Sequence, residues 1–406
     1  MNNPTPPVRP LVDEPLPQPK RWGAAELERL TAMVDQPSLF YWKGPQTTAL
    51  VDEFRRHYPL KYVLPCSSGT ASLHVAVSAL RLRPGDEVIV PPISDMGSYI
   101  GILYQQGVPV FADVDPRTYT LDPADVRRRI TPKTRAIMAV HLAGNPCDLA
   151  ALTAIAREHK LALIEDCAQA WGARWQGRPV GTIGDFGCFS LNDFKHIGCG
   201  DAGIMGSNNE RYGPGLNNWA DKDYGRAEGG RDPETLAPNY RISEPQSAVA
   251  AAQMKKLPDI IARRNRAGEL LTAQLAGTPG VLTPLVQPGN THSYWFYMLR
   301  LELPRFAKPR AELAAALTAE GVACSVLLLR KAAYRWAVFQ NHDIFGGTWP
   351  VRDSGLTKMD YRKVSCPTTE AILEDCLKLP INEAMTEAYI GKVAHAIRTV
   401  LKRFEK

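Results

Sequence analysis

An apolar segment that carries an acid and a later segment that ends in a lysine are the most chemically informative parts of this chain. Residues 161–169 read Leu-Ala-Leu-Ile-Glu-Asp-Cys-Ala-Gln and include Asp166. Residues 189–195 supply the hydroxyl of Ser190 and, at their last position, the amine of Lys195. A lysine can form a Schiff base with an aldehyde, a carboxylate can keep a pyridinium nitrogen protonated, and a hydroxyl can bind a phosphate. These three groups together indicate a site for pyridoxal 5′-phosphate (PLP).

Each of these residues also has a simpler interpretation. Asp166 could cap a turn, and a lone lysine such as Lys195 is most often exposed. Against this, Asp166 ends a strand that is otherwise apolar, and strand alternation directs its neighbour Glu165 to the other face. The glycines after Lys195 would let the backbone approach a bulky ligand. We interpret His196, next to the lysine, as a packed or hydrogen-bonded side chain rather than an acid or base.

A second polar element lies between a predicted strand and a predicted helix. Ser68, Gly69 and Thr70 occupy this turn. Backbone N–H groups at a helix N-terminus, together with hydroxyls, form a good phosphate site. The alternative is that the serine only caps the helix.

The elements that must position these residues alternate between strands and helices. Continuous apolar strands separated by helices predict an α/β fold with a mostly parallel sheet covered on both faces. Ligand sites in such sheets lie at the carboxyl ends of the strands. The predicted strands are 62–64, 87–90, 108–112, 136–140 and 161–165, and the predicted helices between them are 69–82, 97–106, one that begins at Asp122-Pro123, and 149–159.

The length of 406 residues exceeds what one ordinary core accommodates, so we expect more than one domain. Residues 1–22 are rich in proline and predict an extended arm with little core. Residues 23–265 are expected to form the large PLP-binding domain, with two short strands around the lysine and a long helix over 243–275. Residues 266–406 are expected to form a smaller α+β domain, with an insertion at about 330–366.

Composition excludes several classes of protein. A net charge of +6 with only short basic runs argues against nucleic-acid binding. The eight cysteines show no CxxC pair and no Cys/His metal spacing, so we expect no metal site and a reducing compartment. No apolar run reaches the length of a membrane span, and no signal peptide is apparent. We therefore expect a cytoplasmic protein that binds neither membranes nor nucleic acids.

Nine short segments follow one another along the chain in an informative order. They are Ser67–Leu73, Pro84–Pro91, Pro109–Asp115, Thr131–Ile137, Val140–Gly144, Glu165–Gln169, Gly184–Ser190, Lys195 and Asn239–Glu244. In this order and spacing they resemble the DegT/StrS-type sugar and cyclitol aminotransferases, a PLP-dependent family of fold type I. The match is good over about residues 50–265 and weak elsewhere.

The resemblance implies a role for each matching residue. Lys195 would be the Schiff-base lysine, Asp166 the partner of the pyridinium nitrogen, and Gln169 the contact to the 3′-oxygen of the cofactor. Asn239 resembles an asparagine that reaches the phosphate from the neighbouring subunit, which implies a homodimer with shared sites. Ala168 would pack against the ring of the cofactor. The phosphate would be bound by Ser68, Gly69, Thr70 and Ser190.

The chain also departs from the family pattern. Asp95 lies near the position where the family commonly places an aromatic ring over the cofactor. We expect Asp95 to contact the cofactor there, and the stacking partner is missing or comes from elsewhere. Phe194 precedes the lysine where the family usually has threonine. The insertion at 330–366 resembles the longer C-terminal half of the cyclitol-type members.

The function implied by the resemblance is amino transfer from glutamate or glutamine to a keto-sugar or keto-cyclitol, in aminosugar, aminocyclitol or antibiotic biosynthesis. The freed amine of Lys195 would move the proton from the donor's α-carbon to C4′ of the cofactor. Two alternatives stay open: a PLP-dependent dehydratase or lyase, whose members in this family replace the lysine by histidine, and a non-catalytic homologue. Candidate substrate contacts are Tyr41, Trp42, His292, Tyr294, Trp336 and Trp349.

Overall fold

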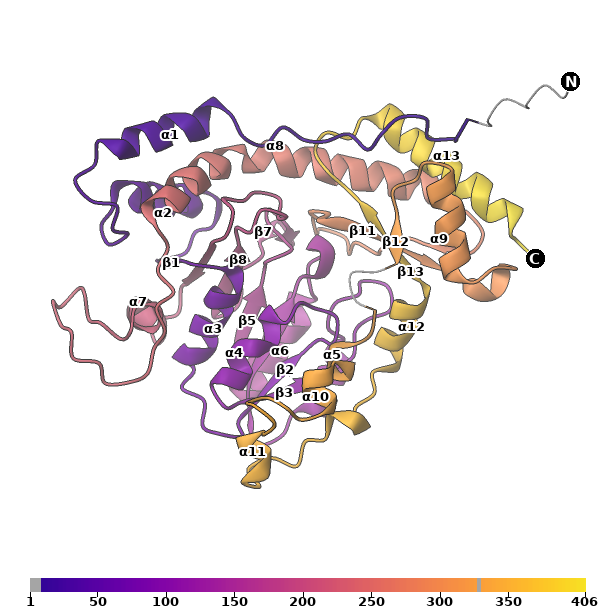
Figure 1. The fold of residues 1–406 in the computed structure, drawn as a ribbon. Helices are drawn as coiled ribbons and strands as arrows, with labels where there is room; N and C mark the ends of the chain where they lie inside the picture. The colour runs from indigo at the N-terminus through magenta and orange to yellow at the C-terminus, as the bar shows by residue number, and fades with distance from the viewer. Residues whose placement is uncertain (1–8, 327–329) are drawn as a thin grey trace, which may run out of the picture.

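A computed structural model describes residues 9–326 and 330–406. The described chain forms a large sheet flanked by helices and a smaller sheet beside it, as Figure 1 shows. The long helix α8 (Glu244–Leu275) runs along both parts. It begins with a capping box in which Gln246 bonds back to Ser243. No helix within the described ranges is both long and apolar enough to cross a membrane.

The large sheet has seven strands in the order β1-β9-β8-β5-β4-β2-β3. Its pairings are parallel except at β9, which is antiparallel to both neighbours, β1 and β8. This mostly parallel sheet confirms the predicted fold class. The strands are β1 (Tyr62–Cys66), β2 (Glu87–Val90), β3 (Val108–Phe111), β4 (Thr134–Val140), β5 (Ala162–Asp166), β8 (Phe186–Ser190) and β9 (Gly203–Ser207).

Helices pack against this sheet and against α8, and their ends follow the local sequence. Asp122 caps α5 by accepting a hydrogen bond from the Ala124 N–H, with Pro123 at the first helical position, as the sequence predicts. Ser68 caps α3 in the same way through Ala71. The helices of this part are α1 (Ala24–Val34), α2 (Pro45–His57), α3 (Gly69–Ala79), α4 (Gly97–Tyr104), α5 (Pro123–Arg129), α6 (Leu149–His159) and α7 (Leu216–Ala220).

The smaller sheet is antiparallel, in the order β10-β11-β13-β12, and it packs a second hydrophobic core against the C-terminal half of α8. A two-stranded ribbon of β6 and β7 lies outside both sheets. The remaining elements are β6 (Arg174–Trp175), β7 (Arg178–Pro179), β10 (Val281–Leu282), β11 (Phe296–Leu301), β12 (Ser325–Val326), β13 (Cys376–Pro380), α9 (Arg310–Ala319), α10 (Ala337–Gln340), α11 (Pro350–Asp353), α12 (Pro367–Asp375) and α13 (Glu387–Arg403).

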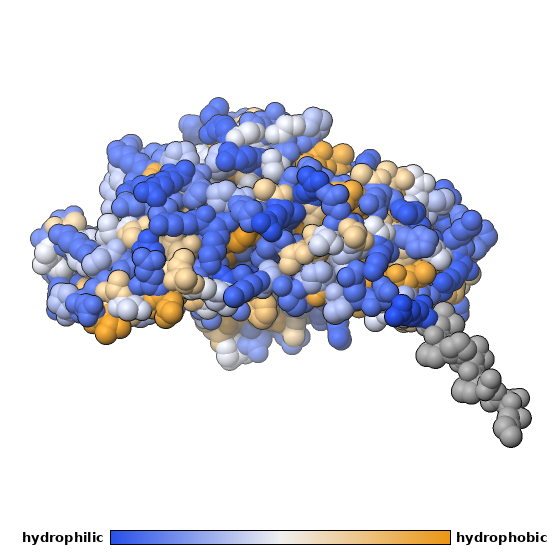
Figure 2. Space-filling view, turned by 90° about the horizontal axis from the view of Figure 1, so that it is seen from above, coloured by the Kyte–Doolittle hydropathy of each residue, from blue (hydrophilic) through white to orange (hydrophobic). Residues whose placement is uncertain are grey.

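The N-terminal arm contributes more to the structure than its composition indicated. Residues 1–8 lie outside the described part, but Val12 is only 2% exposed and belongs to the second core. The arm then runs along α8 toward α1, and the surface seen from above is mainly hydrophilic (Figures 1 and 2). Val12 is the one buried side chain among arm residues 9–22, and its N–H donates to Glu320 O, so this residue fixes the arm to the small-sheet core.

The segment at 330–366 also differs from expectation. It was expected as an insertion of the small domain, but most of its buried side chains join the core of the large sheet. The Tyr361 hydroxyl donates to the carbonyl of Pro109 at 3.0 Å, and the Ala333 N–H donates to Pro92 O at 2.9 Å. Aromatic side chains in this segment, among them Tyr334, pack around Phe111. The segment therefore covers the β3 edge of the large sheet.

Candidate active site

The carboxyl ends of β5 and β8 and the N-terminus of α3 surround a cavity of about 290 Å³. Nine of the ten residues predicted to bind the cofactor line this cavity, although they are far apart in the sequence. They are Ser68, Gly69, Thr70, Asp95, Asp166, Ala168, Gln169, Ser190 and Lys195.

Asp166 lies at the inner end of the cavity, on the last residue of β5. Its side chain is almost fully buried, and it accepts hydrogen bonds from the Ser98 hydroxyl at 2.7 Å and from the Ala168 N–H at 3.0 Å. Burial raises the pKa of Asp166, although the hydrogen bonds from Ser98 and Ala168 and the positive charge of Lys195 oppose the rise. A cationic group in the cavity would offset the cost of this buried charge.

Glu165, the adjacent residue, is directed to the other face of the sheet, as strand alternation predicts. One carboxylate oxygen accepts the N–H groups of Ile183 and Gly184, and the other accepts the N–H of Gly181 and the imidazole of His141. The Cys147 N–H donates to Nδ1 of His141, so Nε2 carries the proton that it donates to Glu165.

His141, Glu165 and Cys167 also form a buried group whose ligand atoms lie within 4.8 Å of one another. The imidazole and carboxylate of this group already have protein partners. Burial raises the pKa of the Cys167 thiol to about 12, although His141 opposes the rise, so the thiolate that a metal requires is disfavoured. We interpret the group as a structural support for the β5 end.

Small residues and hydroxyls form the corner of the cavity between α3 and β8. A Cβ on Gly69 would approach the Cβ of Ser190 to 2.6 Å, so glycine is needed for the helix to begin this close to the strand. The Ser190 hydroxyl accepts only a long hydrogen bond of 3.3 Å from the Asn192 N–H. This corner combines a helix N-terminus with the hydroxyls of Ser68, Thr70 and Ser190, which suits a phosphate.

Gln169 is held in one orientation by the backbone. Its Oε1 accepts the Ala143 N–H at 2.9 Å. Its amide nitrogen has no hydrogen-bond partner within residues 9–326 and 330–406, and the side chain lines the cavity. A donor is therefore available to an oxygen atom of a ligand.

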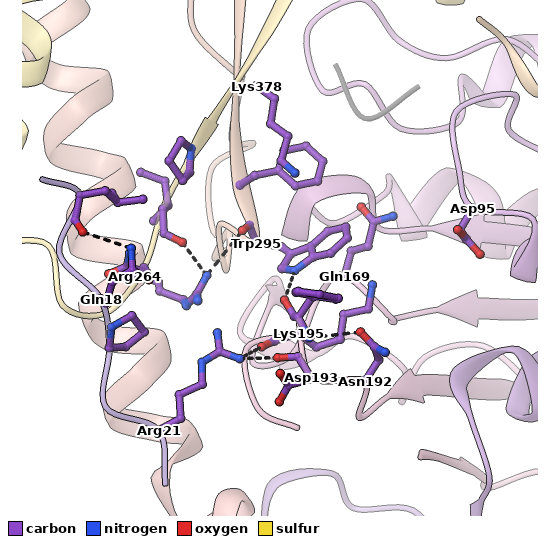
Figure 3. Close-up of a pocket in the computed structure, with 17 residues that line it drawn as sticks. Gln18, Arg21, Asp95, Gln169, Asn192, Asp193, Lys195, Arg264, Trp295 and Lys378 are labelled. Atoms are coloured by element: carbon purple, nitrogen blue, oxygen red, sulfur yellow. Dashed lines mark hydrogen bonds between the residues drawn. The ribbon is translucent and has the colours of Figure 1, made fainter. Parts of the chain in front are cut away.

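Lys195 enters the cavity from a loop that three contacts fix. The Lys195 N–H donates to Asn192 O at 2.9 Å, and Nη1 of Arg21 donates to the Lys195 carbonyl at 2.8 Å (Figure 3). Nζ lies 3.7 Å from the ring centroid of Trp295. Burial lowers the pKa of Lys195 to about 8, although the carboxylates of Asp166 and Asp95 oppose the fall.

The two neighbours of the lysine that raised questions in the sequence take different positions. His196 is fully buried and its Nε2 lies 3.1 Å from the Ser293 carbonyl, so it is packed and hydrogen-bonded as expected. Burial lowers its pKa far below the usual range. Asp95 is exposed at the cavity mouth, where its Oδ1 accepts the Gly97 N–H at 2.9 Å. No aromatic side chain is among the residues that line the smaller cavity.

A larger cavity of about 890 Å³ shares Asp95, Gln169, Asn192 and Lys195 with the smaller one and extends toward the small sheet. Its walls include arm residues such as Arg21 and side chains from the small sheet, such as Lys378 (Figure 3). Neither cavity is lined, within the described chain, by the six candidate substrate contacts, which are Tyr41, Trp42, His292, Tyr294, Trp336 and Trp349.

Three functional neighbours were missed by sequence reasoning. Ser98 could have been identified from its spacing, because it lies four residues after Ser94 and would share one face of a helical turn with it. The two hydroxyls are hydrogen-bonded at 2.6 Å. Trp295 could have been separated from the buried Tyr294 by the alternation of side chains before a strand. Arg21 had no signal, since it reaches the lysine loop only through the path of the arm.

Asn239 is the one predicted contact that lies outside the cavity. It is exposed and pairs with Asp221 in an isolated β-bridge. The neighbouring carbonyl of Tyr240 accepts the Ser67 N–H at 2.8 Å, but Asn239 itself is not among the residues that line the cavity.

The residues present fit PLP. A buried acid faces a buried amine across the cavity, an amide donor is held by the backbone, and the corner where a Cβ would clash carries hydroxyls at a helix start. These groups match a pyridine nitrogen, an aldehyde, a ring oxygen and a phosphate, respectively.

Comparisons with known proteins agree with this arrangement. The model of the DegT/DnrJ/EryC1/StrS aminotransferase family matches residues 21–398. The L-glutamine:2-deoxy-scyllo-inosose aminotransferase of Streptoalloteichus tenebrarius is 37% identical over 340 residues, covering 79% of this chain and 78% of that protein. GDP-perosamine synthase of Caulobacter vibrioides is 30% identical over 355 residues, covering 86% and 88%.

Solved structures show the same fold over almost the whole chain. The crystal structure of 3-amino-5-hydroxybenzoic acid synthase matches with a TM-score of 0.84 and 26% identity, covering 96% of this chain and 99% of that one. The family model and the relative named as an aminotransferase support the transaminase interpretation over the dehydratase and the non-catalytic alternatives. The chain belongs to the DegT/DnrJ/EryC1/StrS family and is a PLP-dependent aminotransferase.

Proposed function

We propose that this aminotransferase moves an amino group from glutamate or glutamine to a keto-sugar or keto-cyclitol, in the biosynthesis of an aminosugar, aminocyclitol or related antibiotic. The observation that carries the proposal is that Lys195 and Asp166 line one cavity that continues into a second, larger one. The larger cavity has room for a polyhydroxylated ring. Two relatives named for amination of a cyclitol and of a nucleotide sugar, respectively, support this substrate class.

PLP, when bound, accepts the electrons released at the donor's α-carbon. In the proposal Asp166 holds a proton on the pyridine nitrogen, and the Gln169 amide donates to the 3′-oxygen. The hydroxyls of Ser68, Thr70 and Ser190 bind the phosphate. Nζ of Lys195 carries the proton away from the α-carbon, and a pKa of about 8 leaves part of this amine neutral near pH 7.

The proposal includes a homodimer with shared sites. Asn239 lies outside its own chain's cavity, so a phosphate contact from it would have to reach a partner's site. Its bridge partner Asp221 forms ion pairs with Arg226 and Arg241, whose guanidinium carbons lie 4.9 and 5.5 Å from the ring centroid of the exposed Phe40, so Asn239 and Phe40 belong to one surface. We propose that this surface faces the partner subunit. All eight cysteines are free, which suits the reducing cytoplasm.

Reduction and peptide mapping test the lysine assignment. The PLP-loaded protein should be yellow, and borohydride should fix the cofactor on the peptide that contains Lys195. Lys195→Ala should not carry this label. Its rate of amino transfer should fall about 10²–10⁴-fold, because the group that carries the proton is gone. Lys308→Ala, at an exposed lysine, should keep both.

A label on another lysine would contradict the assignment. Glutamate or glutamine should bleach the wild-type protein, and the substrate is then found by adding keto-sugars and keto-cyclitols and measuring the return of the aldehyde spectrum. If neither donor bleaches the loaded protein, the proposed donor class is wrong.

A further inference from the structure

Among the cations that line the larger cavity, apart from the reacting amine of Lys195, one ammonium has no hydrogen-bond or ion-pair partner within the described residues. Arg264 donates to Glu383 at 2.8 Å and to the Ile381 carbonyl at 2.7 Å. Arg21 donates to the carbonyls of Asp193 and Lys195. The ammonium of Lys378, by contrast, forms no hydrogen bond or ion pair with any residue in the described part of the chain.

Lys378 lies on β13, which pairs with β11 through Met298, and its side chain enters the cavity beside Trp295 (Figure 3). Nζ is 5.1 Å from the ring centroid of Phe296 and 6.0 Å from that of Trp295. Aromatic faces attract a cation but do not neutralise it. Burial lowers the pKa of the Lys378 ammonium, so the site disfavours its charge when no anion is present.

The position of Lys378 relative to Lys195 limits what the anion can be. Nζ of Lys195 is 3.7 Å from the Trp295 centroid, and that of Lys378 is 6.0 Å from it, so the two nitrogens lie within about 10 Å of each other. An anion bound by Lys378 would therefore lie near the reacting amine. The reactant that necessarily has an anion there is the amino-acid donor, whose α-carboxylate is attached to the carbon that bears the amine.

We propose that Lys378 binds the α-carboxylate of the amino-acid donor and so forms the donor subsite of the cavity. This inference rests on the proposed function, since it requires an amino-acid donor. In the second half of the reaction the same space receives a ring whose hydroxyls carry no charge. Lys378 is therefore expected to matter more for the donor than for the keto substrate.

The test measures donor binding and not only turnover. In Lys378→Gln, the glutamate or glutamine concentration that gives half-maximal bleaching should rise about 10- to 100-fold, while the limiting bleaching rate changes less than about threefold. Lys378→Arg keeps the charge and should restore most of the affinity. Lys308→Gln, at an exposed lysine of the same small domain, should behave as the wild type.

A readout independent of chemistry uses glutarate, an unreactive dicarboxylate, titrated into the PLP-loaded protein by calorimetry. Its affinity should fall at least tenfold in Lys378→Gln, whereas the weak binding of its uncharged diamide should not change. Unchanged glutarate and donor affinities in a variant with wild-type thermal stability would overturn the inference and leave the proposed function intact. Weaker use of the keto substrate with unchanged donor affinity would also overturn it. Failure of the wild type to bleach would instead reject the proposed function.

Discussion

Glu165 and Asp166 are adjacent, acidic and buried, yet they lie in opposite environments. Glu165 accepts four hydrogen bonds, three of them from the backbone of residues 181–184. Asp166 accepts two, from Ser98 and from the Ala168 N–H, and faces a cavity. The protein supplies the Glu165 carboxylate with a full set of hydrogen-bond donors and leaves the Asp166 carboxylate with fewer donors than it can accept.

This difference separates a structural acid from a functional one. A buried carboxylate with every lone pair used holds chain segments together and has no capacity for a ligand. A buried carboxylate with unused capacity is costly to the protein alone and becomes favourable only with a cationic ligand. Two substitutions and a pH titration, taken from the largest expected effect to the smallest, can test this contrast.

Glu165→Gln should reduce the free energy of unfolding by about 3–5 kcal/mol, because the amide nitrogen would face backbone N–H donors and at least one would lose its acceptor. The measurement is urea denaturation of the cofactor-free protein, followed by circular dichroism and tryptophan fluorescence. Glu158→Gln, which removes only an exposed ion pair with Arg127, should change stability little. Equal urea midpoints for Glu165→Gln and the wild type would show that the Glu165 carboxylate has no structural role.

Asp166→Asn should have the opposite effect, with a loss of activity and no loss of stability. Amino transfer should fall about 10²–10³-fold, since the charge opposite the pyridine nitrogen is lost. The thermal midpoint of the cofactor-free protein should stay the same or rise at neutral pH. The folded-state pKa of Asp166 is raised, so its ionisation lowers stability as pH rises through the unfolded value, and asparagine removes that penalty.

Asp166→Glu, which keeps the charge, is the matched control and should retain more activity than asparagine. A fully active Asp166→Asn protein would mean that another group partners the ring nitrogen. A loss of stability comparable to that of Glu165→Gln would mean that the two acids do not differ in kind.

The same two acids show how far sequence reasoning reaches. Apolar strands, caps such as Asp122 and the alternation at Glu165 and Asp166 are local, so the central sheet could be predicted, and nine of the ten residues expected to bind the cofactor line one cavity. Trp295, Arg21 and Lys378 reach the cavity from the small sheet and the arm. Alternation could separate Trp295 from the buried Tyr294, but the cavity that these three side chains reach depends on how distant segments dock, which no local periodicity encodes.

The segment at 330–366 illustrates the same limit. Its composition predicts loops but does not say which core they cover, and contacts such as that of Tyr361 with Pro109 join residues 252 positions apart. The candidate substrate contacts show the same limit: the Tyr41 hydroxyl donates to Asp221 at 2.7 Å, and Trp349 is buried and lines neither cavity.

The smallest expected effect concerns the titration of Lys195. The neutral amine reacts with aldehydes, so the rate at which PLP attaches to the cofactor-free protein should rise with pH, with a midpoint near the lowered pKa of about 8 rather than near the ordinary lysine value. The attachment is followed by borohydride trapping and mass spectrometry of the peptide that contains Lys195.

The contrast between the two acids predicts how this midpoint responds to substitution. The Asp166 carboxylate raises the pKa of Lys195, so Asp166→Asn should move the midpoint to lower pH by about one pH unit or less. Glu165→Gln should leave the midpoint unchanged wherever the protein remains folded, because its charge is directed to the other face and neutralised by its own donors. Equal displacements in both variants would show that the sheet does not insulate one acid from the cavity, and the division between structural and functional carboxylate would then fail at its electrostatic basis.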